Sequence, residues 1–282
     1  MNLIEKIKLL DVENPDHIEL LKELAEKALD HRLRYTALAR LDANEHGDLI
    51  ARIAKNDPVD IICTMAISKF SADRHADYLA DIAKSNQRED VCTEAFSSFD
   101  ASFNIDKYRR SDLFAAIAKN AQHAGIRREA IYYLDEDKYS DLVTDIAEND
   151  PDWKVRKTAV TKLYQNKYSE VVTRIAKNDQ VDKVREIAIY RLAENKENHA
   201  TLIDIVKQNI DNRIVCKAAI FALPLLDEFV DFYTYVIEKS PYLNIRQSAT
   251  TRLHKLYSKN NPSKLNDLCK NDPETRLKKL KL

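Results

Sequence analysis

Glycine is scarce in this chain, because Gly47 and Gly125 are the only two among 282 residues. A phosphate-cradling loop needs several glycines close together, so that backbone N–H groups can approach the phosphate. Turns and bulges of strands also depend on glycine for left-handed backbone conformations. The sequence therefore excludes a P-loop and a dinucleotide-binding fingerprint, and it argues against a β-barrel.

Long apolar runs and paired cysteines are missing as well. No stretch of about 18 apolar residues occurs, so we expect neither a membrane-spanning helix nor a membrane partner. Residues 1–11 carry charges inside their apolar pattern, which is not typical of a signal peptide. No Cys-x-x-Cys pair joins the four cysteines, which are Cys63, Cys92, Cys216 and Cys269. Such sparse usage is typical of reduced thiols, and we expect a cytoplasmic protein.

An excess of one charge is also absent. Lys and Arg together number 45, and Asp and Glu number 46. Bulk electrostatic attraction to nucleic acid or to a membrane surface is therefore not expected. Hydrophobic residues make up 44% of the chain, which is enough for a substantial core.

What the chain does contain is one recurring phrase. Ile53-Ala54-Lys55-Asn56-Asp57 returns almost unchanged at 146–150 and 175–179. Nine related segments start 29 to 35 residues apart, at Leu24, Ile53, Ile82, Ile117, Ile146, Ile175, Ile205, Val236 and Leu268. We number the repeats one to nine from these starts, and we count positions within each repeat from its start residue. A period of this length indicates stacked supersecondary units.

Alignment of the repeats produces columns of similar residues. Position 9 is always Leu, Ile or Val, and positions 9, 13, 14 and 17 form one apolar stripe at helical spacing. Position 13 is alanine in eight consecutive repeats: Ala37, Ala66, Ala95, Ala130, Ala159, Ala188, Ala218 and Ala249. A small side chain at a fixed place lets two helices approach closely. Each repeat therefore predicts two helices, helix A ending at the repeated phrase and helix B carrying the stripe.

The residues Asn56, Asp57 and Pro58 predict the conformation of the corner between the two helices. We expect the asparagine to end helix A in the left-handed conformation. The aspartate is expected to be the N-cap of helix B, with proline at the first helical position.

The ends and one stretched repeat depart from this pattern. Residues 2–10 predict a capping helix with Leu3, Ile4, Ile7 and Leu10 inward. Six extra residues within 101–111 predict a longer loop or a helix extension. Residues 276–282 resemble an incomplete last helix B.

The phrase Asn-Asp-Pro-x-x-x-Val-Arg-x-x-Ala-hydrophobic-x-x-Leu, clearest from Asn149 to Leu163, resembles HEAT-like repeats of the short phycobilin-lyase type. The resemblance covers essentially the whole chain. It implies an all-α, right-handed α-solenoid of about nine two-helix repeats, forming one domain over residues 1–282 with repeats from 15 to 282. It also implies that the arginine at position 10 bonds the aspartate of an inter-helix turn. This column holds Arg34, Arg127, Arg156, Arg185 and Arg246, with Lys278 in the last repeat.

Relatives of this repeat include enzymes, but the residues for their chemistry are missing. Deoxyhypusine hydroxylases use His-Glu pairs as iron ligands, and no His-Glu dipeptide occurs here. No two histidines are spaced i, i+4. Cys63 and Cys92 occupy the arginine column of repeats two and three, where we expect small buried thiols. We therefore predict a protein that is not an enzyme and has no cofactor and no metal site.

Charged residues on helix B give the functional hypothesis. Positions 8, 11, 12, 15 and 16 should point away from the apolar stripe or along its edge. In the first eight repeats they hold only four acids: Asp90, Glu94, Glu129 and Glu186. They hold twelve bases: Arg32, Arg40, Lys69, Arg128, Lys154, Lys157, Lys162, Lys183, Arg191, Arg213, Lys217 and Arg252. Tyr35, Tyr132, Tyr133, Tyr190 and Trp153 lie in or beside this ridge, and aromatic residues with arginine are typical of binding hot spots.

The ridge is densest in repeats five to seven. The candidate binding residues there are Trp153, Lys154, Lys157, Lys162, Lys183, Tyr190, Arg191, Arg213 and Lys217. We predict a non-catalytic scaffold that binds an acidic protein or peptide in a concave groove lined by the B helices. A nucleic-acid-binding module or a base-repair enzyme of the DNA-alkylation-repeat type is one alternative. It is less favoured because only one tryptophan is available for base stacking. A phycobilin-lyase-like subunit is the other alternative, and a merely solvated ridge would have no partner.

Overall fold

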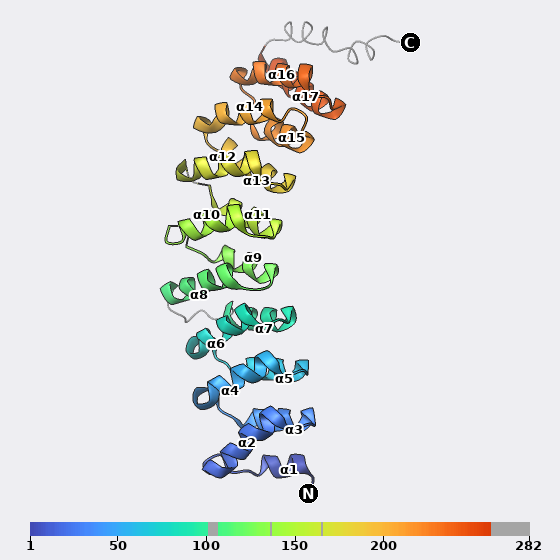
Figure 1. Ribbon diagram of the computed structural model, residues 1–282. Helices are drawn as coiled ribbons and strands as arrows, with labels where there is room; N and C mark the ends of the chain where they lie inside the picture. Colours follow the sequence, from blue (N-terminus) through green and yellow to red (C-terminus); the bar gives the residue numbers. More distant parts are fainter. Residues whose placement is uncertain (101–106, 136, 165, 261–282) are drawn as a thin grey trace, which may run out of the picture. The chain divides into compact units, whose positions relative to one another are not determined.

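The computed structural model describes residues 1–100, 107–135, 137–164 and 166–260. Within these residues there are 17 α-helices, three short 3₁₀ helices and no strand, which confirms the all-α prediction (Figure 1). Helices that follow one another in the chain pack together in order. The chain divides, inside α10, into two compact units: an N-terminal unit of residues 1–142 and a C-terminal unit of residues 143–282.

The N-terminal unit contains repeats one to four behind a short first helix. Its A helices contact one another in order, from α2 through α4 and α6 to α8, and its B helices do so from α3 through α5 and α7 to α9. Helix α1 packs against α3, at the start of the B row. The helices are α1 (Leu3–Lys8), α2 (Pro15–Lys27), α3 (His31–Arg40), α4 (Ala43–Asn56), α5 (Asp60–Ser68), α6 (Ala72–Ser85), α7 (Glu89–Asp100), α8 (Lys107–Asn120) and α9 (Ala124–Tyr132).

The C-terminal unit continues the alternation of A and B helices. The B helices α11, α13, α15 and α17 each contact the next, and α12 contacts α14 in the A row. The 3₁₀ helices at 166–168, 196–198 and 227–229 precede three of the A helices. The α-helices are α10 (Ser140–Asn149), α11 (Trp153–Lys162), α12 (Ser169–Asn178), α13 (Asp182–Ala193), α14 (His199–Gln208), α15 (Arg213–Ala222), α16 (Val230–Lys239) and α17 (Leu243–Asn260).

The alanine column lies in the core, as predicted. All eight alanines at position 13 are fully buried, from Ala37 in α3 to Ala249 in α17. Their place on successive B helices, which contact each other in both units, explains the need for a small side chain. A larger residue would separate helices that the rest of the core holds together.

The predicted conformation of the inter-helix corner is wrong. Asn56 ends α4 without a left-handed backbone, and no described residue has a positive φ. The N-cap of α5 is Val59, so Asp57 and Pro58 both precede the helix. Proline disfavours the helical region for the residue before it, and Asp57 is accordingly extended, at φ −67° and ψ 131°. Its carboxylate then accepts the Val59 N–H at 2.9 Å and turns the chain.

The capping helix forms, but one of its predicted core residues is exposed. Asn2 and Glu5 make a capping box that starts α1 at Leu3. Ile7 is buried, whereas Leu3 lies in solvent because α1 is short and only one side of it contacts α3. Within the stretched repeat, residues 107–111 extend the start of α8, and 101–106 lie outside the described residues. Repeat nine, with residues 276–282, also lies outside them.

Replacement of Ala159 or Ala188 by leucine should destabilise the protein by about 1–3 kcal/mol, because three extra carbon atoms must be forced between packed helices. Chemical denaturation measures this change. Ala200→Leu, at an exposed position of α14, is the matched control and should change stability by less than about 0.5 kcal/mol. Equal effects at the buried and exposed sites would show that the alanine column does not set the helix spacing.

Candidate functional site

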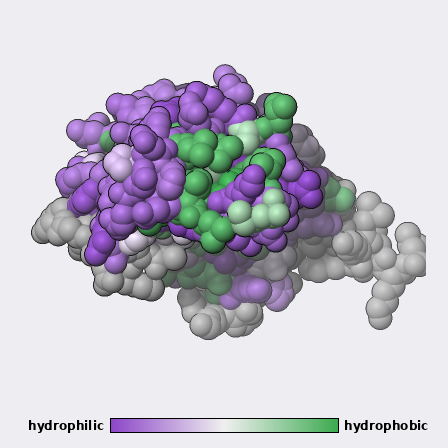
Figure 2. Space-filling model, turned by 90° about the horizontal axis from the view of Figure 1, so that it is seen from below, coloured by the Kyte–Doolittle hydropathy of each residue, from purple (hydrophilic) through white to green (hydrophobic). Residues whose placement is uncertain are grey.

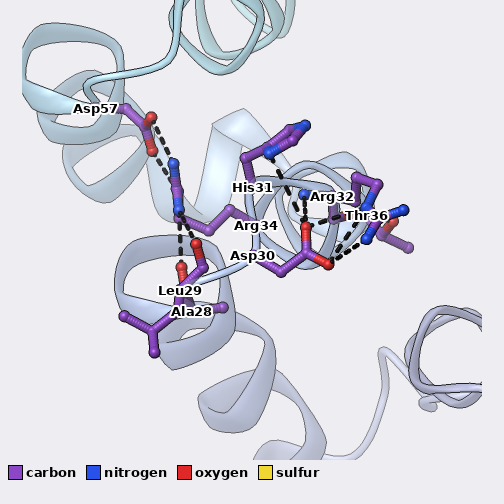
Figure 3. Close-up of polar contacts among 8 residues, drawn as sticks. All are labelled: Ala28, Leu29, Asp30, His31, Arg32, Arg34, Thr36 and Asp57. Carbon is purple, nitrogen blue, oxygen red and sulfur yellow. Dashed lines mark hydrogen bonds and ion pairs between the residues drawn. The ribbon is translucent and has the colours of Figure 1, made fainter.

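Polar residues at several positions of the repeat form hydrogen bonds between successive repeats. The arginine at position 10 gives the clearest example. Arg34 is buried, and its guanidinium bonds the Asp57 carboxylate of the next repeat, with Nε–Oδ2 at 2.7 Å and Nη2–Oδ1 at 3.0 Å (Figure 3). Its Nη1 donates to the Ala28 carbonyl of its own corner at 2.8 Å. Arg156 repeats this geometry with Asp179 and with the Asp150 carbonyl. Bidentate pairing of this kind fixes both groups, so the arginine locks one corner to the next.

Arg185 departs from this arrangement. The prediction was a bond to an aspartate of an inter-helix turn, but Arg185 bonds Asp182 in its own helix. The next repeat has Asn209 where a corner aspartate would be, and that amide donates to the Ile205 carbonyl at 2.9 Å. Without a carboxylate in the next corner, the guanidinium binds the nearest acid in α13. The prediction for Arg156 is therefore confirmed and that for Arg185 is wrong.

Three repeats lack the column arginine, and the following repeat supplies a donor in its place. The missing arginines are replaced by Cys63, Cys92 and Val215. In each case the residue at position 6 of the next repeat donates to a carbonyl of the open corner: Arg88 to Asp57 at 3.4 Å, His123 to Asn86 at 3.1 Å, and Tyr242 to Asp211 at 2.9 Å. The two cysteines are buried, and desolvation raises the pKa of both thiols, that of Cys92 to about 11. Each thiol also donates to the corner carbonyl of its own repeat, Cys63 to Asp57 at 3.2 Å and Cys92 to Asn86 at 3.3 Å, and both thiols are poor nucleophiles.

This substitution could have been found in the sequence. After a repeat that has the arginine, position 6 is Val59, Asp152, Val181, Asp211 or Glu274. Valine and ionised carboxylates have no hydrogen-bond donor in the side chain. A donor appears at position 6 only after the repeats that lost the arginine. The signal is a correlation between position 10 of one repeat and position 6 of the next.

A second structural column is position 16, at the end of helix B. Arg40, Lys69, Arg191 and Arg252 each donate to a carbonyl at the end of the preceding B helix, or of α1 in the case of Arg40. For Arg191 the acceptor is Thr161, at 2.9 Å, and its other nitrogen bonds Glu194 at 2.5 Å. These bonds satisfy carbonyls that a helix end leaves open. Arg191, a predicted binding residue, is therefore held by the fold.

Five of the predicted binding cations are exposed, and none of them has an acidic partner among the residues that the structure describes. They are Lys154, Lys157, Lys183, Arg213 and Lys217, all in the B row of the C-terminal unit. Helices α11 and α15 contain no acidic residue at all. Lys162 is half-buried, and Tyr190 is exposed at the border of this group. We call the five cations with Trp153 the basic B face.

Trp153 lies between lysines of two repeats. The Lys154 ammonium is 5.9 Å from the centroid of the indole, and the Lys183 ammonium, from the next B helix, is 5.5 Å from it. An aromatic face attracts a cation and holds it near the ring. The half-buried indole therefore brings two positive charges together at one point of the surface.

The location of these cations opposes the helix dipole. Lys154, Lys183 and Arg213 occupy the first or second residue of α11, α13 and α15. The N-terminus of a helix carries a partial positive charge, so a cation there is unfavourable by about 0.3–1 kcal/mol at an exposed site. Three successive B helices of the C-terminal unit thus carry a cation where helix stability favours an acid.

Cations of the A helices behave differently. Arg52 pairs with Glu26 at 2.7 Å, and Arg174 pairs with Glu148 at 2.9 Å, each between successive A helices. Lys138, in the turn before α10, also pairs with Asp112 of α8, at 2.5 Å. Ion pairs between successive repeats therefore neutralise part of the charge along the A rows, whereas the five cations of the basic B face form no ion pair with the described residues.

The part of the chain that the structure describes offers no metal site and no membrane-spanning helix. No group of three or more His, Cys, Asp or Glu side chains there could hold a metal ion. None of the described helices combines the length and the apolar character needed to cross a membrane. Comparison with models of known protein families finds none that matches this chain, and comparison with curated proteins finds no significant match.

The exchange of donors between position 10 and position 6 can be tested by restoring the arginine. Arg88→Ala should cost about 1–2 kcal/mol of stability, because the Asp57 carbonyl loses a charged donor and Asp60 and Asp90 lose their ion-pair partner. Cys63→Arg alone crowds two guanidinium groups into one corner and should also destabilise. The double variant should be more stable than the sum of the two changes by about 0.5–3 kcal/mol, as measured by denaturant unfolding of all four proteins. Strictly additive effects would mean that the two positions do not share one role.

Proposed function

We propose that the chain is a right-handed α-solenoid of HEAT-like repeats, and that it is a non-catalytic scaffold. Its partner is an acidic protein or peptide segment, which binds the basic B face. Two features support the solenoid: the separate rows of A and B helices within each unit, and the Arg–Asp bonds that join successive corners. Repeats of this kind present extended surfaces to elongated partners.

The single observation that carries the binding proposal is the unpaired charge on α11, α13 and α15. Helices in contact have axes about 8–10 Å apart, so Lys154, Lys183 and Arg213 repel one another and also oppose the helix dipoles. Carboxylates of a partner would relieve both penalties with charge-assisted hydrogen bonds. Trp153 and Tyr190 add aromatic surface beside the charges, as binding hot spots commonly do.

An acidic peptide is favoured over nucleic acid by composition. The chain contains one tryptophan and balances 45 basic against 46 acidic residues, whereas nucleic-acid binding rests on extended positive surfaces and on several stacking aromatics. The same cations could contact phosphate groups, so a nucleic-acid probe belongs in the test.

Reversal of Lys154, Lys183 and Arg213 to glutamate should weaken binding of a fluorescent glutamate-rich 12-residue peptide by at least about tenfold. Fluorescence anisotropy at several salt concentrations measures the affinity. Trp153, the only tryptophan, reports whether the peptide reaches this face, since its emission should change on binding. The matched control reverses three exposed lysines at the ends of A helices: Lys177, Lys207 and Lys239.

The control variant has the same net charge as the site variant and should bind within about twofold of the wild type. The site variant should melt no lower than the wild type, because acids at helix N-termini are stabilising. Unaltered affinity in the site variant, or equal losses in both variants, would refute the proposal. Tighter binding of a DNA or RNA oligonucleotide than of the peptide would favour the nucleic-acid alternative.

A further inference from the structure

Apolar side chains gather at the end of the molecule where the chain begins. Figure 2 views this end and shows a hydrophobic area over α1 and α2, with hydrophilic residues around it. Leu9 is 70% exposed and Leu20 is 43% exposed. Met1, Leu3 and Val12 are exposed as well. A contiguous exposed apolar area on a protein surface commonly marks an interaction site.

The equivalent position in repeat three shows what the exposed side of α2 would contact in another repeat. Leu20 lies four residues before the start of repeat one, and Tyr78 lies at the same place in repeat three. The Tyr78 ring packs on Gly47 of the preceding A helix so closely that a Cβ there would lie 2.6 Å from it. Its hydroxyl also donates to Asp48 at 2.8 Å. Residues in this column therefore face the preceding A helix.

No A helix precedes that of repeat one in the residues that the structure describes. Its B helix, α3, does have a neighbour, because α1 packs against it and accepts hydrogen bonds from Arg40 as a preceding B helix would. The start residue is buried in repeats two to eight, from Ile53 to Val236, but Leu24 in repeat one is only partly buried. One side of α2 thus carries the contact surface of the A row with nothing from the described chain on it.

We propose that a second copy of the chain covers this surface, with α2 of one copy packed antiparallel on α2 of the other about a two-fold axis. The contact continues the A-row interface that already joins α2, α4, α6 and α8 within the N-terminal unit. Asp16 lies in the first turn of α2 and Lys27 in its last turn, so antiparallel helices place opposite charges side by side. Two-fold pairing uses the same surface twice and closes, whereas head-to-tail stacking would continue into filaments.

Sedimentation velocity over a range of concentrations tests the proposal with the full chain. The wild type should be a dimer at roughly tens of micromolar, the range in which modest specific interfaces associate. Leu20→Asp should be monomeric and should retain its helical content, because the residue is half-exposed in the single chain. Leu29→Asp is the matched control: Leu29 is fully exposed in the α2–α3 corner, outside the proposed contact, and this variant should remain dimeric.

A cross-linking experiment locates the axis. In a Cys269→Ser background, Leu20→Cys should form a disulfide with its own copy on mild oxidation, because residues beside a two-fold axis meet their equivalents. Leu29→Cys should not, and Cys63, Cys92 and Cys216 are buried. A monomeric wild type, a dimer that Leu20→Asp leaves intact, equal dissociation of both aspartate variants, or growth into larger species would each overturn the proposal.

Discussion

Close packing between successive B helices is the constraint on which the rest of the structure depends. A pair of short helices cannot bury its own apolar face, so each repeat must complete its core with its neighbours. The eight buried alanines keep the B helices close, and this closeness puts the corners of adjacent repeats within reach of one side chain. Within the described residues, the same dependence on neighbours leaves an apolar side of α2 exposed, with Leu20 on it.

The corners are held by hydrogen bonds that cross from one repeat to the next. Helix ends leave carbonyls without partners, and burial makes an unsatisfied carbonyl costly. Arg34 meets this need while also binding the Asp57 carboxylate of the next corner. Where cysteine replaces arginine, Arg88 or His123 approaches from the following repeat. The corner carbonyl therefore has a donor in each case, although the position of that donor in the sequence changes.

The cations of the B helices fall into two groups: those that hydrogen-bond to the fold and those that do not. Arg156 and Arg191 each donate to a backbone carbonyl of a corner or a helix end, and their removal would disturb the stack. Lys154, Lys183 and Arg213 make no such bond in the described residues and lie where the helix dipole disfavours them. Residues that weaken a fold without serving it are commonly retained for function, and this supports the basic B face as a binding surface.

The sequence by itself determined the repeat, the two helices in each repeat and the buried alanine column, because helical periodicity and side-chain size are local properties that recur with the repeat. It also located the cations of the B helices. Only the tertiary structure decided which of these cations have a hydrogen-bond partner within the fold. Arg191 donates to a carbonyl 30 residues away. Arg185 bonds Asp182 because the next corner has Asn209 in place of an aspartate. Partners of long side chains depend on the neighbouring repeat, so no single repeat's sequence contains that information.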